Sequence, residues 1–426
     1  MDQILYNHQL SGTVQIPASK SVAHRAYICA SLADLPTEII CNSDSVDICA
    51  TRDCLARLQT AGQEKSASAL VLDCKESGST LRFLLPLACV LTKRLNKPIH
   101  FTGADYLAKR PLSPLVEELC AHGANISSPG TFPLIVSGEL IPGIFTLPGN
   151  ISSQYISGLL MALPLLPGDS EIHITGNRES VSYIGLTLAM QKEFHIIITE
   201  TAYGYHIPGN QSYHSPGKLT IEADWSSAAF WLAAGAIGKT APILTGLSLT
   251  SAQGDRAVLR ILESFGAKIQ AGDSGITVTK PTKLHGTQVD ASDVPDLIPI
   301  LAVVAAYAKG KTEFINAGRL RIKESDRIVS TEELLNRLGV KTESTADTLT
   351  VYGLSCETDS ASARSPVTIR SFNDHRIAMS AAIAATVYHQ PLLLTQADAV
   401  TKSYPTFYEH YKNLGGHTKA VTPELE

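Results

Sequence analysis

A unit of about 70 residues recurs six times along the chain, and it constrains the fold more than any single motif. Each copy has a small polar or acidic cluster, then a helix rich in alanine and leucine, then a glycine or proline turn and a strand. The copies begin 58 to 78 residues apart, which is too long for a solenoid repeat and suits a unit of mixed strands and helices. They start near Ser19, Ser77, Ser152, Asp224, Asp296 and Asp374.

These units predict an α/β protein with buried helices covered by sheets. The helices are apolar almost all round, as helices inside a protein are, and Ser, Asp or Asn at their starts can cap them. Alternating strand-like segments flank them, for example at 171–174 and 276–280. Because 426 residues exceed one core, we expect two domains of three units, with helix N-termini converging on a positive cleft between them. Unrelated repetitions of an ordinary α/β pattern are the alternative.

Composition argues against several classes of protein. The chain is 44% hydrophobic and 18% charged, as globular proteins are, and no run of 18 apolar residues could span a membrane. A net charge of −5 argues against nucleic acid as a partner, so an anion site must be built locally. No export signal opens the sequence, so we expect a cytoplasmic protein.

Cofactor motifs do not occur in the sequence. Neither GxxxxGK[ST] nor GxGxxG is present, which argues against ATP and NAD. The eight cysteines and 13 histidines show no ligand-like spacing, so we expect no metal. Seven of the cysteines lie between residues 29 and 120, mostly in apolar surroundings, and we expect them to be small core residues.

The segment from Arg321 to Arg327 reads RIKESDR and precedes a leucine-rich stretch with helical spacing. This pattern predicts a helix entrance that binds anions, because the helix N-terminus adds partial positive charge to two arginines and a lysine. If the turn is helical, Lys323 and Arg327 share one face, with Glu324 beside them. A solvated charge run at a helix start is the alternative.

Basic and hydroxyl side chains gather in the same way at other helix starts, where they suit phosphates or carboxylates. These residues are Lys20, Ser21 and Arg25; Gly78, Ser79 and Arg82; Ser152, Ser153 and Gln154; His375 and Arg376; and, in loops, Arg110 and Lys402. Plain helix caps beside exposed bases are the alternative. Together the clusters predict a cleft for two anionic small molecules, with Asp296 and Glu324 available for proton transfer.

Taken in their order along the sequence, these segments resemble those of the 5-enolpyruvylshikimate-3-phosphate (EPSP) synthase family, and the resemblance covers essentially the whole chain. The resemblance rests on PASKSxxxR at 17–25, SGSTLR at 77–82, KRP at 109–111, SSQ at 152–154, QGD at 253–255, PD at 295–296, RIKESDR at 321–327, NDHRIAM at 373–379 and Lys402. It implies a two-domain inverted α/β fold, each domain of three βαβαββ units, with the active site in the interdomain cleft. Residues 20–223 would form one domain, and residues 1–19 with 224–426 the other.

The resemblance also implies a reaction. The family transfers the enolpyruvyl group of phosphoenolpyruvate to the 5-hydroxyl of shikimate 3-phosphate and releases phosphate, on the route to aromatic amino acids. It does so by addition and elimination through a tetrahedral intermediate. Asp296 would take the hydroxyl proton, while Glu324 and Lys20 would serve the C3 and phosphate ends. We therefore expect a monomer with small-molecule substrates and no cofactor, in a family targeted by glyphosate.

Matching the motifs residue by residue gives two sets of substrate contacts. Those for shikimate 3-phosphate are Lys20, Ser21, Arg25, Ser152, Ser153, Gln154, Ser180, Tyr183, Asp296 and Lys323. Those for phosphoenolpyruvate are Lys20, Gly78, Arg110, Gln154, Arg327, Arg376 and Lys402. This chain departs from the family pattern where Glu76 and Ser79 replace the asparagine and threonine of GNxGT, and where Ser45 replaces a frequent second aspartate after Asp44.

Two other functions stay open. A related enolpyruvyl transferase acts on UDP-N-acetylglucosamine, but its loop before the arginine usually carries a cysteine and its first motif reads like GAKNA. Here the loop is GADYLAKRP and the first motif is ASKSVAHR. The other is a non-catalytic anion-binding relative, which would have lost at least one key residue. This chain keeps all five: Lys20, Asp296, Lys323, Glu324 and Arg376.

Overall fold

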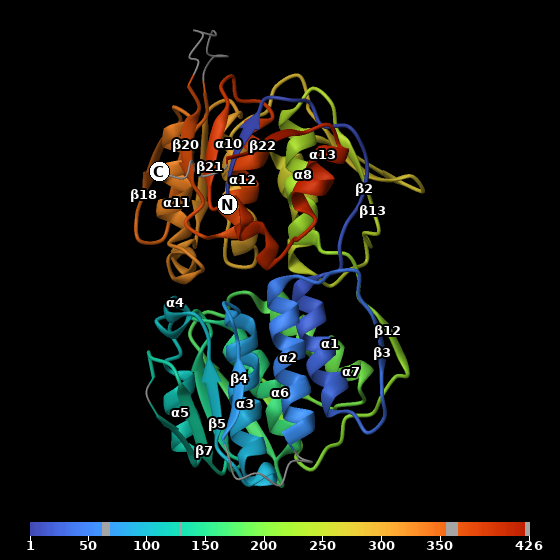
Figure 1. Cartoon of the computed structure of the whole chain (residues 1–426), viewed down its shortest axis with the longest axis vertical. Coiled ribbons are helices and arrows are strands. Elements are labelled where there is room, and N and C mark those ends of the chain that lie inside the picture. Colours follow the sequence, from blue (N-terminus) through green and yellow to red (C-terminus); the bar gives the residue numbers. More distant parts are fainter. Residues whose placement is uncertain (62–68, 128, 355–364, 422–426) are drawn as a thin grey trace. The chain divides into compact units, whose positions relative to one another are not determined.

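The computed structural model describes residues 1–61, 69–127, 129–354 and 365–421 (Figure 1). The chain forms two compact units, one of residues 18–221 and one of residues 1–17 with 222–426. We expected the boundaries two residues later, after 19 and 223. The difference has a local cause, because the Ala18 amide donates to Asn42 Oδ1 and the Ile221 amide donates to the Ile40 carbonyl, which ties both residues to the first unit.

The unit of residues 18–221 is built around α3 and α6, which pack against each other. Its helices are α1 (Lys20–Leu32), α2 (Val46–Ala61), α3 (Gly78–Leu95), α4 (Asp105–Ala108), α5 (Leu115–Ala121), α6 (Ser153–Ala162), η1 (Leu163–Leu165) and α7 (Val181–Glu193). Its strands are β3 (Glu38–Ile40), β4 (Leu70–Asp73), β5 (Ile99–Thr102), β6 (Ala124–Ser127), β7 (Leu134–Gly138), β8 (Ile144–Pro148), β9 (Ser170–Thr175), β10 (Thr199–Glu200), β11 (Gly204–Ile207) and β12 (Lys218–Thr220).

The other unit takes its first two strands from the start of the chain, β1 (Asp2–Tyr6) and β2 (Gly12–Gln15). Its helices are α8 (Trp225–Ile237), η2 (Gly254–Ala257), α9 (Val258–Ser264), η3 (Pro295–Leu297), α10 (Ile298–Ala306), η4 (Gly318–Ile322), α11 (Arg327–Arg337), α12 (His375–Ala385), η5 (Ala397–Lys402) and α13 (Phe407–Asn413). Its remaining strands are β13 (Pro242–Thr245), β14 (Lys268–Gly272), β15 (Gly275–Thr279), β16 (Gln288–Asp290), β17 (Lys311–Ile315), β18 (Lys341–Ser344), β19 (Leu349–Tyr352), β20 (Val367–Arg370), β21 (Leu392–Thr395) and β22 (His417–Val421).

Five four-stranded sheets in the described chain share one topology, which is the repeat seen in the sequence. In the sheet β4-β5-β7-β6, the first two strands run parallel and the later two pair antiparallel to their neighbours. The sheet β20-β21-β1-β22 has the same pattern, with β1 from the far end of the chain in its interior. Strands β3 and β12 form a separate parallel pair.

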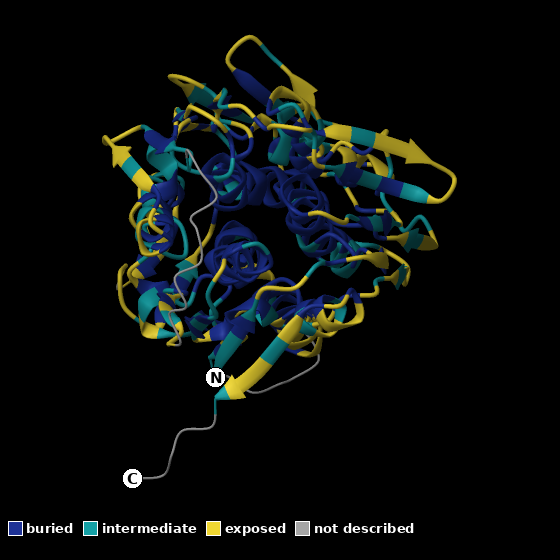
Figure 2. Ribbon diagram, turned by 90° about the horizontal axis from the view of Figure 1, so that it is seen from above, coloured by how far each residue is buried: buried dark blue, intermediate teal, exposed yellow. Residues whose placement is uncertain are grey.

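The helices that open the repeats are buried, as predicted. Every residue of α8, α10 and α12 is buried, and these three helices pack against one another. Figure 2 shows the same division, with buried residues on interior helices and exposed ones on the strands and loops around them. The strand expected at 171–174 is confirmed as part of β9, and the one expected at 276–280 is confirmed as part of β15 except for its last residue, because β15 ends at Thr279.

Some local expectations need correction. Of the six expected caps, Ser77, Ser152, Asp224 and Asp374 accept a backbone N–H of their helix, but Ser19 does not, and Asp296 lies inside η3. The cysteines at 29, 54, 74 and 89 are buried, whereas those at 41 and 49 are half-buried and Cys120 is exposed. Cys356 lies outside the described residues.

Candidate active site

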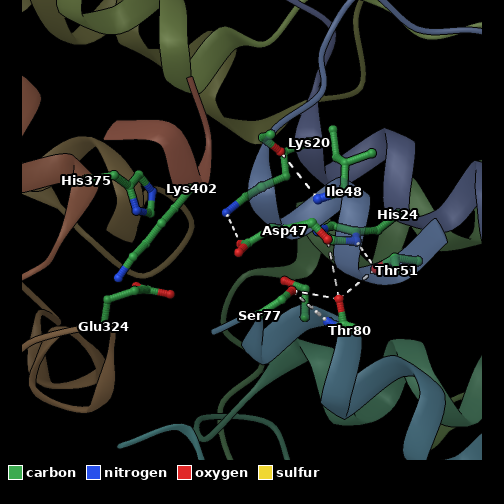
Figure 3. Close-up of polar contacts among 12 residues, drawn as sticks. Lys20, His24, Asp47, Ile48, Thr51, Ser77, Thr80, Glu324, His375 and Lys402 are labelled. Atoms are coloured by element: carbon green, nitrogen blue, oxygen red, sulfur yellow. Dashed lines mark hydrogen bonds and ion pairs between the residues drawn. The ribbon is translucent and has the colours of Figure 1, made fainter. Parts of the chain in front are cut away.

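The start of α1 presents two of the predicted anion ligands. Lys20 is the first residue of the helix, and its Nζ lies 2.8 Å from Asp47 Oδ2 at the start of α2 (Figure 3). Ser21 follows and is half-buried. Asp47 was not singled out in the sequence, and its position in the first turn of a helix was the available signal.

Arg25, one turn further on, is buried and surrounded by neutral acceptors. Its guanidinium donates to Thr187 Oγ1 at 2.6 Å, to the Ser21 carbonyl at 2.6 Å and to the Tyr183 carbonyl at 2.9 Å. No carboxylate pairs with it in the described part of the chain, and burial lowers its pKa to about 10. An anion bound here would supply the missing negative charge.

The start of α3 is held close to two arginines. A side chain at Gly78 would put its Cβ 2.6 Å from Arg110 Nη1, so the guanidinium packs against the bare backbone. Arg82 Nη1 donates to Gln154 Oε1 at 3.0 Å, and Gln154 Nε2 donates to Ser79 Oγ at 2.9 Å. Ser79, one of the residues that depart from the family pattern, is thus bonded to a predicted substrate ligand.

The remaining predicted ligands of this unit lie at two more helix starts. Ser152 caps α6 and accepts the Gln154 amide at 3.3 Å, and Ser153 is the buried first residue of that helix. Ser180 precedes α7 with a left-handed backbone (φ 54°), which is uncommon for serine and is found preferentially at functional sites. The Tyr183 carbonyl binds Arg25, which joins this turn to α1.

In the other unit, Asp296 gathers three cations. Its carboxylate accepts from Arg327 Nη1 at 2.7 Å and from Arg376 Nη2 at 3.0 Å, and Lys323 Nζ lies 3.7 Å away. Burial pushes the pKa of Asp296 up, but Arg376, Lys323 and Arg327 together hold it well below its usual range. Burial lowers the pKa of Lys323 to about 8, although Asp296 opposes this.

Arg327 is fully buried among three carboxylates. It binds Asp296, Glu324 Oε2 at 2.7 Å and Asp374 Oδ2 at 2.8 Å. The expectation that Lys323 and Arg327 share a helical face is wrong, because Asp326 caps α11 and the helix begins only at Arg327. Lys323 instead follows η4 in an extended conformation. Both side chains still reach Asp296 Oδ1.

The start of α12 completes this half of the site. Asp374 caps the helix through the Arg376 amide at 2.9 Å, and His375 beside it is buried. Lys402 Nζ donates to the Asn373 carbonyl at 2.7 Å, so it lies next to the same turn. Sequence reasoning missed Asp374 as a ligand of Arg327, although it stands within the NDHRIAM motif.

Asp255, from the QGD motif, is a second acidic residue whose chemistry the sequence did not reveal. It is buried and accepts a hydrogen bond from Ser226 Oγ at the start of α8. Burial, with Asp296 nearby, raises its pKa to about 7, although Arg376 opposes the shift. Two carboxyls with pKa values driven in opposite directions therefore lie in the same unit.

Each unit thus presents cations and hydroxyls at helix starts, and in each unit a carboxylate is bound to some of these cations. Among the described residues, no group of His, Cys, Asp or Glu is arranged to hold a metal ion. No helix in the described ranges is both long and apolar enough to cross a membrane.

Known proteins resemble the chain over nearly its whole length. A model of the family described as EPSP synthase (3-phosphoshikimate 1-carboxyvinyltransferase) matches residues 6–411. A protein of Clostridium beijerinckii named 3-phosphoshikimate 1-carboxyvinyltransferase is 40% identical over 97% of both chains. One of that name from Clostridium perfringens is 41% identical over 98% of this chain and 99% of its own.

Solved structures show the same fold. The EPSP synthase of Acinetobacter baumannii superposes with a TM-score of 0.76 and 24% identity, covering 99% of this chain and 100% of its own. The enolpyruvyl transferase NikO of Streptomyces tendae also superposes with a TM-score of 0.76, at 19% identity over 99% of both chains. From the family match and the curated relatives, the chain belongs to the EPSP synthase (3-phosphoshikimate 1-carboxyvinyltransferase) family.

Proposed function

We propose that the protein transfers the enolpyruvyl group of phosphoenolpyruvate to the 5-hydroxyl of shikimate 3-phosphate and releases phosphate. The observation that carries this proposal is the identity of about 40%, over nearly the full length, to relatives named for that activity. The clusters described above supply the charges that two anionic substrates need. The proposal requires the clusters of both units to act on one pair of substrates.

For shikimate 3-phosphate, we assign the hydroxyls and cations of α1, α6 and α7, together with Asp296 and Lys323. Arg25 supports this assignment, because its buried charge has neutral partners in the described residues and so suits a phosphate. Ser152 and Ser153 lie at the N-terminus of α6, where an anion is favoured by the helix dipole.

For phosphoenolpyruvate, we assign Lys20, Gly78, Arg110 and Gln154 from one unit, and Arg327, Arg376 and Lys402 from the other. The Arg110 guanidinium lies against Gly78, so an anion at the α3 N-terminus would meet both the helix N–H groups and a guanidinium. Arg376 already binds one carboxylate, that of Asp296, and can exchange it for the carboxylate of the substrate.

This exchange gives Asp296 its role in the reaction. While three cations hold its pKa low, Asp296 is ionised but a weak base. A substrate carboxylate on Arg327 and Arg376 would weaken their hold on Asp296 and raise its pKa. Asp296 can then take the 5-hydroxyl proton as the oxygen attacks C2 of phosphoenolpyruvate.

Two further side chains, Glu324 and Lys20, take part in the rest of the reaction. C3 takes up a proton as the tetrahedral intermediate forms, and returns it as the bond from C2 to the phosphate oxygen breaks and the C2=C3 double bond is restored. The hydroxyl proton taken by Asp296 leaves with the phosphate, so that no net proton remains on the protein. We assign proton transfer at C3 to Glu324, and the support of the phosphate to Lys20. We further infer a cytosolic monomer that needs no cofactor.

The test is phosphate release by the purified protein, given phosphoenolpyruvate with either shikimate 3-phosphate or UDP-N-acetylglucosamine. Release only with shikimate 3-phosphate supports the proposal. Release only with the nucleotide sugar would move the protein to the related transferase. No release with either would favour a non-catalytic anion-binding protein, provided that calorimetry still detects binding of shikimate 3-phosphate.

A further inference from the structure

A buried chain of polar side chains joins α1 to the first turn of α3 (Figure 3). His24 Nδ1 lies 2.7 Å from Thr51 Oγ1, on α2, and Thr51 Oγ1 lies 2.6 Å from Thr80 Oγ1. Thr80 Oγ1 in turn donates to Ser77 Oγ at 2.7 Å. All four residues are buried, so each link is made within the protein.

This series of hydrogen bonds ends, on the α3 side, at the turn that carries some of the proposed phosphoenolpyruvate contacts. Ser77 is the N-cap of α3 and accepts the Thr80 amide at 3.1 Å. Gly78 follows it against Arg110, and Ser79 accepts a bond from Gln154. A small movement of Ser77 or Thr80 would therefore displace the helix N-terminus from both of those partners.

The imidazole is neutral, because burial, followed by the charges of Lys20 and Arg25, lowers the pKa of His24 well below its ordinary value. A neutral imidazole has one N–H, and each hydroxyl has one O–H. Since Thr80 donates to Ser77, it must accept from Thr51, and Thr51 must then accept from His24. This order requires the proton on Nδ1 and leaves Nε2 as an acceptor, which has no hydrogen-bond partner among the described residues.

We propose that His24 is a positioning residue that holds the Ser77–Thr80 turn through Thr51 and Thr80, and so sets the affinity for phosphoenolpyruvate. The effect on that substrate rests on the proposed function, whereas the hydrogen-bond order does not. His24 itself touches neither substrate in this assignment. It acts through the two threonines.

The kinetic test compares variants that remove or keep the links. His24→Leu and Thr51→Val should raise KM for phosphoenolpyruvate by about tenfold, as expected for one lost buried hydrogen bond, with a much smaller change in KM for shikimate 3-phosphate. His24→Asn places a side-chain N–H near the Nδ1 position and Thr51→Ser keeps the hydroxyl, so both should recover most of the affinity. Equal changes in the two KM values, or none, would overturn the proposal.

Thr92→Val is the matched control. Thr92 is also buried on α3, but its Oγ1 donates to the Gly138 carbonyl at 2.8 Å, near the other end of the helix. Loss of this hydroxyl should lower the melting temperature about as much as Thr51→Val does, and leave both KM values unchanged. A rise in KM for phosphoenolpyruvate with this variant would mean that any weakening of α3 has the same effect.

Two readouts do not need turnover. The imidazole ¹⁵N shifts of the full chain, assigned by the signal lost in His24→Asn, should show a proton on Nδ1 of His24. Amide exchange of Thr80 should speed up in His24→Leu and not in Thr92→Val. A proton on Nε2 of His24, or an unchanged exchange rate of the Thr80 amide in His24→Leu, would contradict the inference even if the protein is an active enzyme. The expected results would support the hydrogen-bond order even if the protein is not active.

Discussion

At the scale of single residues, the site depends on charges that oppose one another. Asp296 is kept ionised by three cations, while Asp255 in the same unit is driven towards its neutral form by burial. Arg327 is fully buried and forms ion pairs with three carboxylates. If the proposed function holds, an anion bound here would change the basicity of the neighbouring carboxylates as well as neutralise the cations.

Asp296→Asn should lower kcat by between about 10² and 10⁴, the usual range for loss of a general base. The amide still accepts a hydrogen bond from Arg327 or Arg376, so binding of shikimate 3-phosphate should be largely kept. Steady-state phosphate release measures the first effect and calorimetry the second. Turnover like that of the unmodified protein would show that another group takes the hydroxyl proton.

Binding of shikimate 3-phosphate should weaken as the pH rises above 8. A free lysine titrates near 10.4, whereas burial lowers the pKa of Lys323 to about 8, so its charge is present below that pH and lost above it. A bound phosphate favours the charged form, and the affinity should therefore fall by up to about tenfold per pH unit above 8. Calorimetry at several pH values measures this slope.

Lys323→Arg is the matched variant, because an arginine keeps its charge throughout this range. Its affinity should be flat between pH 8 and 9, where the second ionisation of the substrate phosphate is already complete and Arg25, with a pKa of about 10, is still charged. A slope that persists in Lys323→Arg would assign the titration to another group.

At the scale of elements, many of the site residues lie at the start of a helix, whereas Lys323 follows η4 in an extended segment and Lys402 ends η5. The first residue of α11 shows how such a start is defined. Asp326 accepts the amides of Ile328 and Val329, both at 3.1 Å, and this fixes Arg327 as the first helical residue. Its carboxylate also binds Arg321 Nη1 at 2.9 Å, a partly exposed pair of small energetic weight.

Asp326→Ala should lower the free energy of unfolding by about 1 kcal/mol, as for other lost N-caps. Asp326→Asn keeps an acceptor for the two amides and should cost much less. The midpoint of urea unfolding, followed by far-UV circular dichroism, compares the two variants. Equal losses would mean that the charge of Asp326, and not its capping bonds, stabilises α11.

The helices could be predicted from the sequence, because alanine- and leucine-rich runs that are apolar on every side have to be buried. Their exact starts could not. Asp296 and Lys323 looked like helix-entrance residues, yet one lies in a 3-10 turn and the other in an extended segment. A polar residue can cap or precede a helix, and the backbone angles that decide between these depend on packing that the sequence does not display.

The carboxylate partners were harder still to predict. Arg327 and Asp374 are 47 residues apart, and Arg376 and Asp296 are 80 apart, so no local pattern joins them. Motif matching brought most of these residues into consideration, but it assigned them to substrates. The structure adds that they also bind one another.

At the scale of the whole molecule, one unit is discontinuous in the chain, and its first segment is structural. β1 lies between β21 and β22, with Gln3 opposite both Leu394 and Ala420. Leu5 in β1 is fully buried, and β2 pairs with β13. Pairings of such long separation leave no trace in local sequence patterns. Length and the repeat therefore predicted two domains, but that one of them is discontinuous followed only from the family resemblance.

We therefore expect residues 222–426 alone to fail to fold, because β21 and β22 would both lose the strand that joins them. Residue 421 lies opposite Asp2, so a rearranged chain of 222–426 followed by 1–17 restores β1 through a short connection. This permuted chain should melt cooperatively by circular dichroism, as should residues 18–221, in which β3 and β12 pair within the fragment. Cooperative melting of 222–426 without the first 17 residues, at the same temperature as the permuted chain, would show that β1 and β2 are dispensable to that unit.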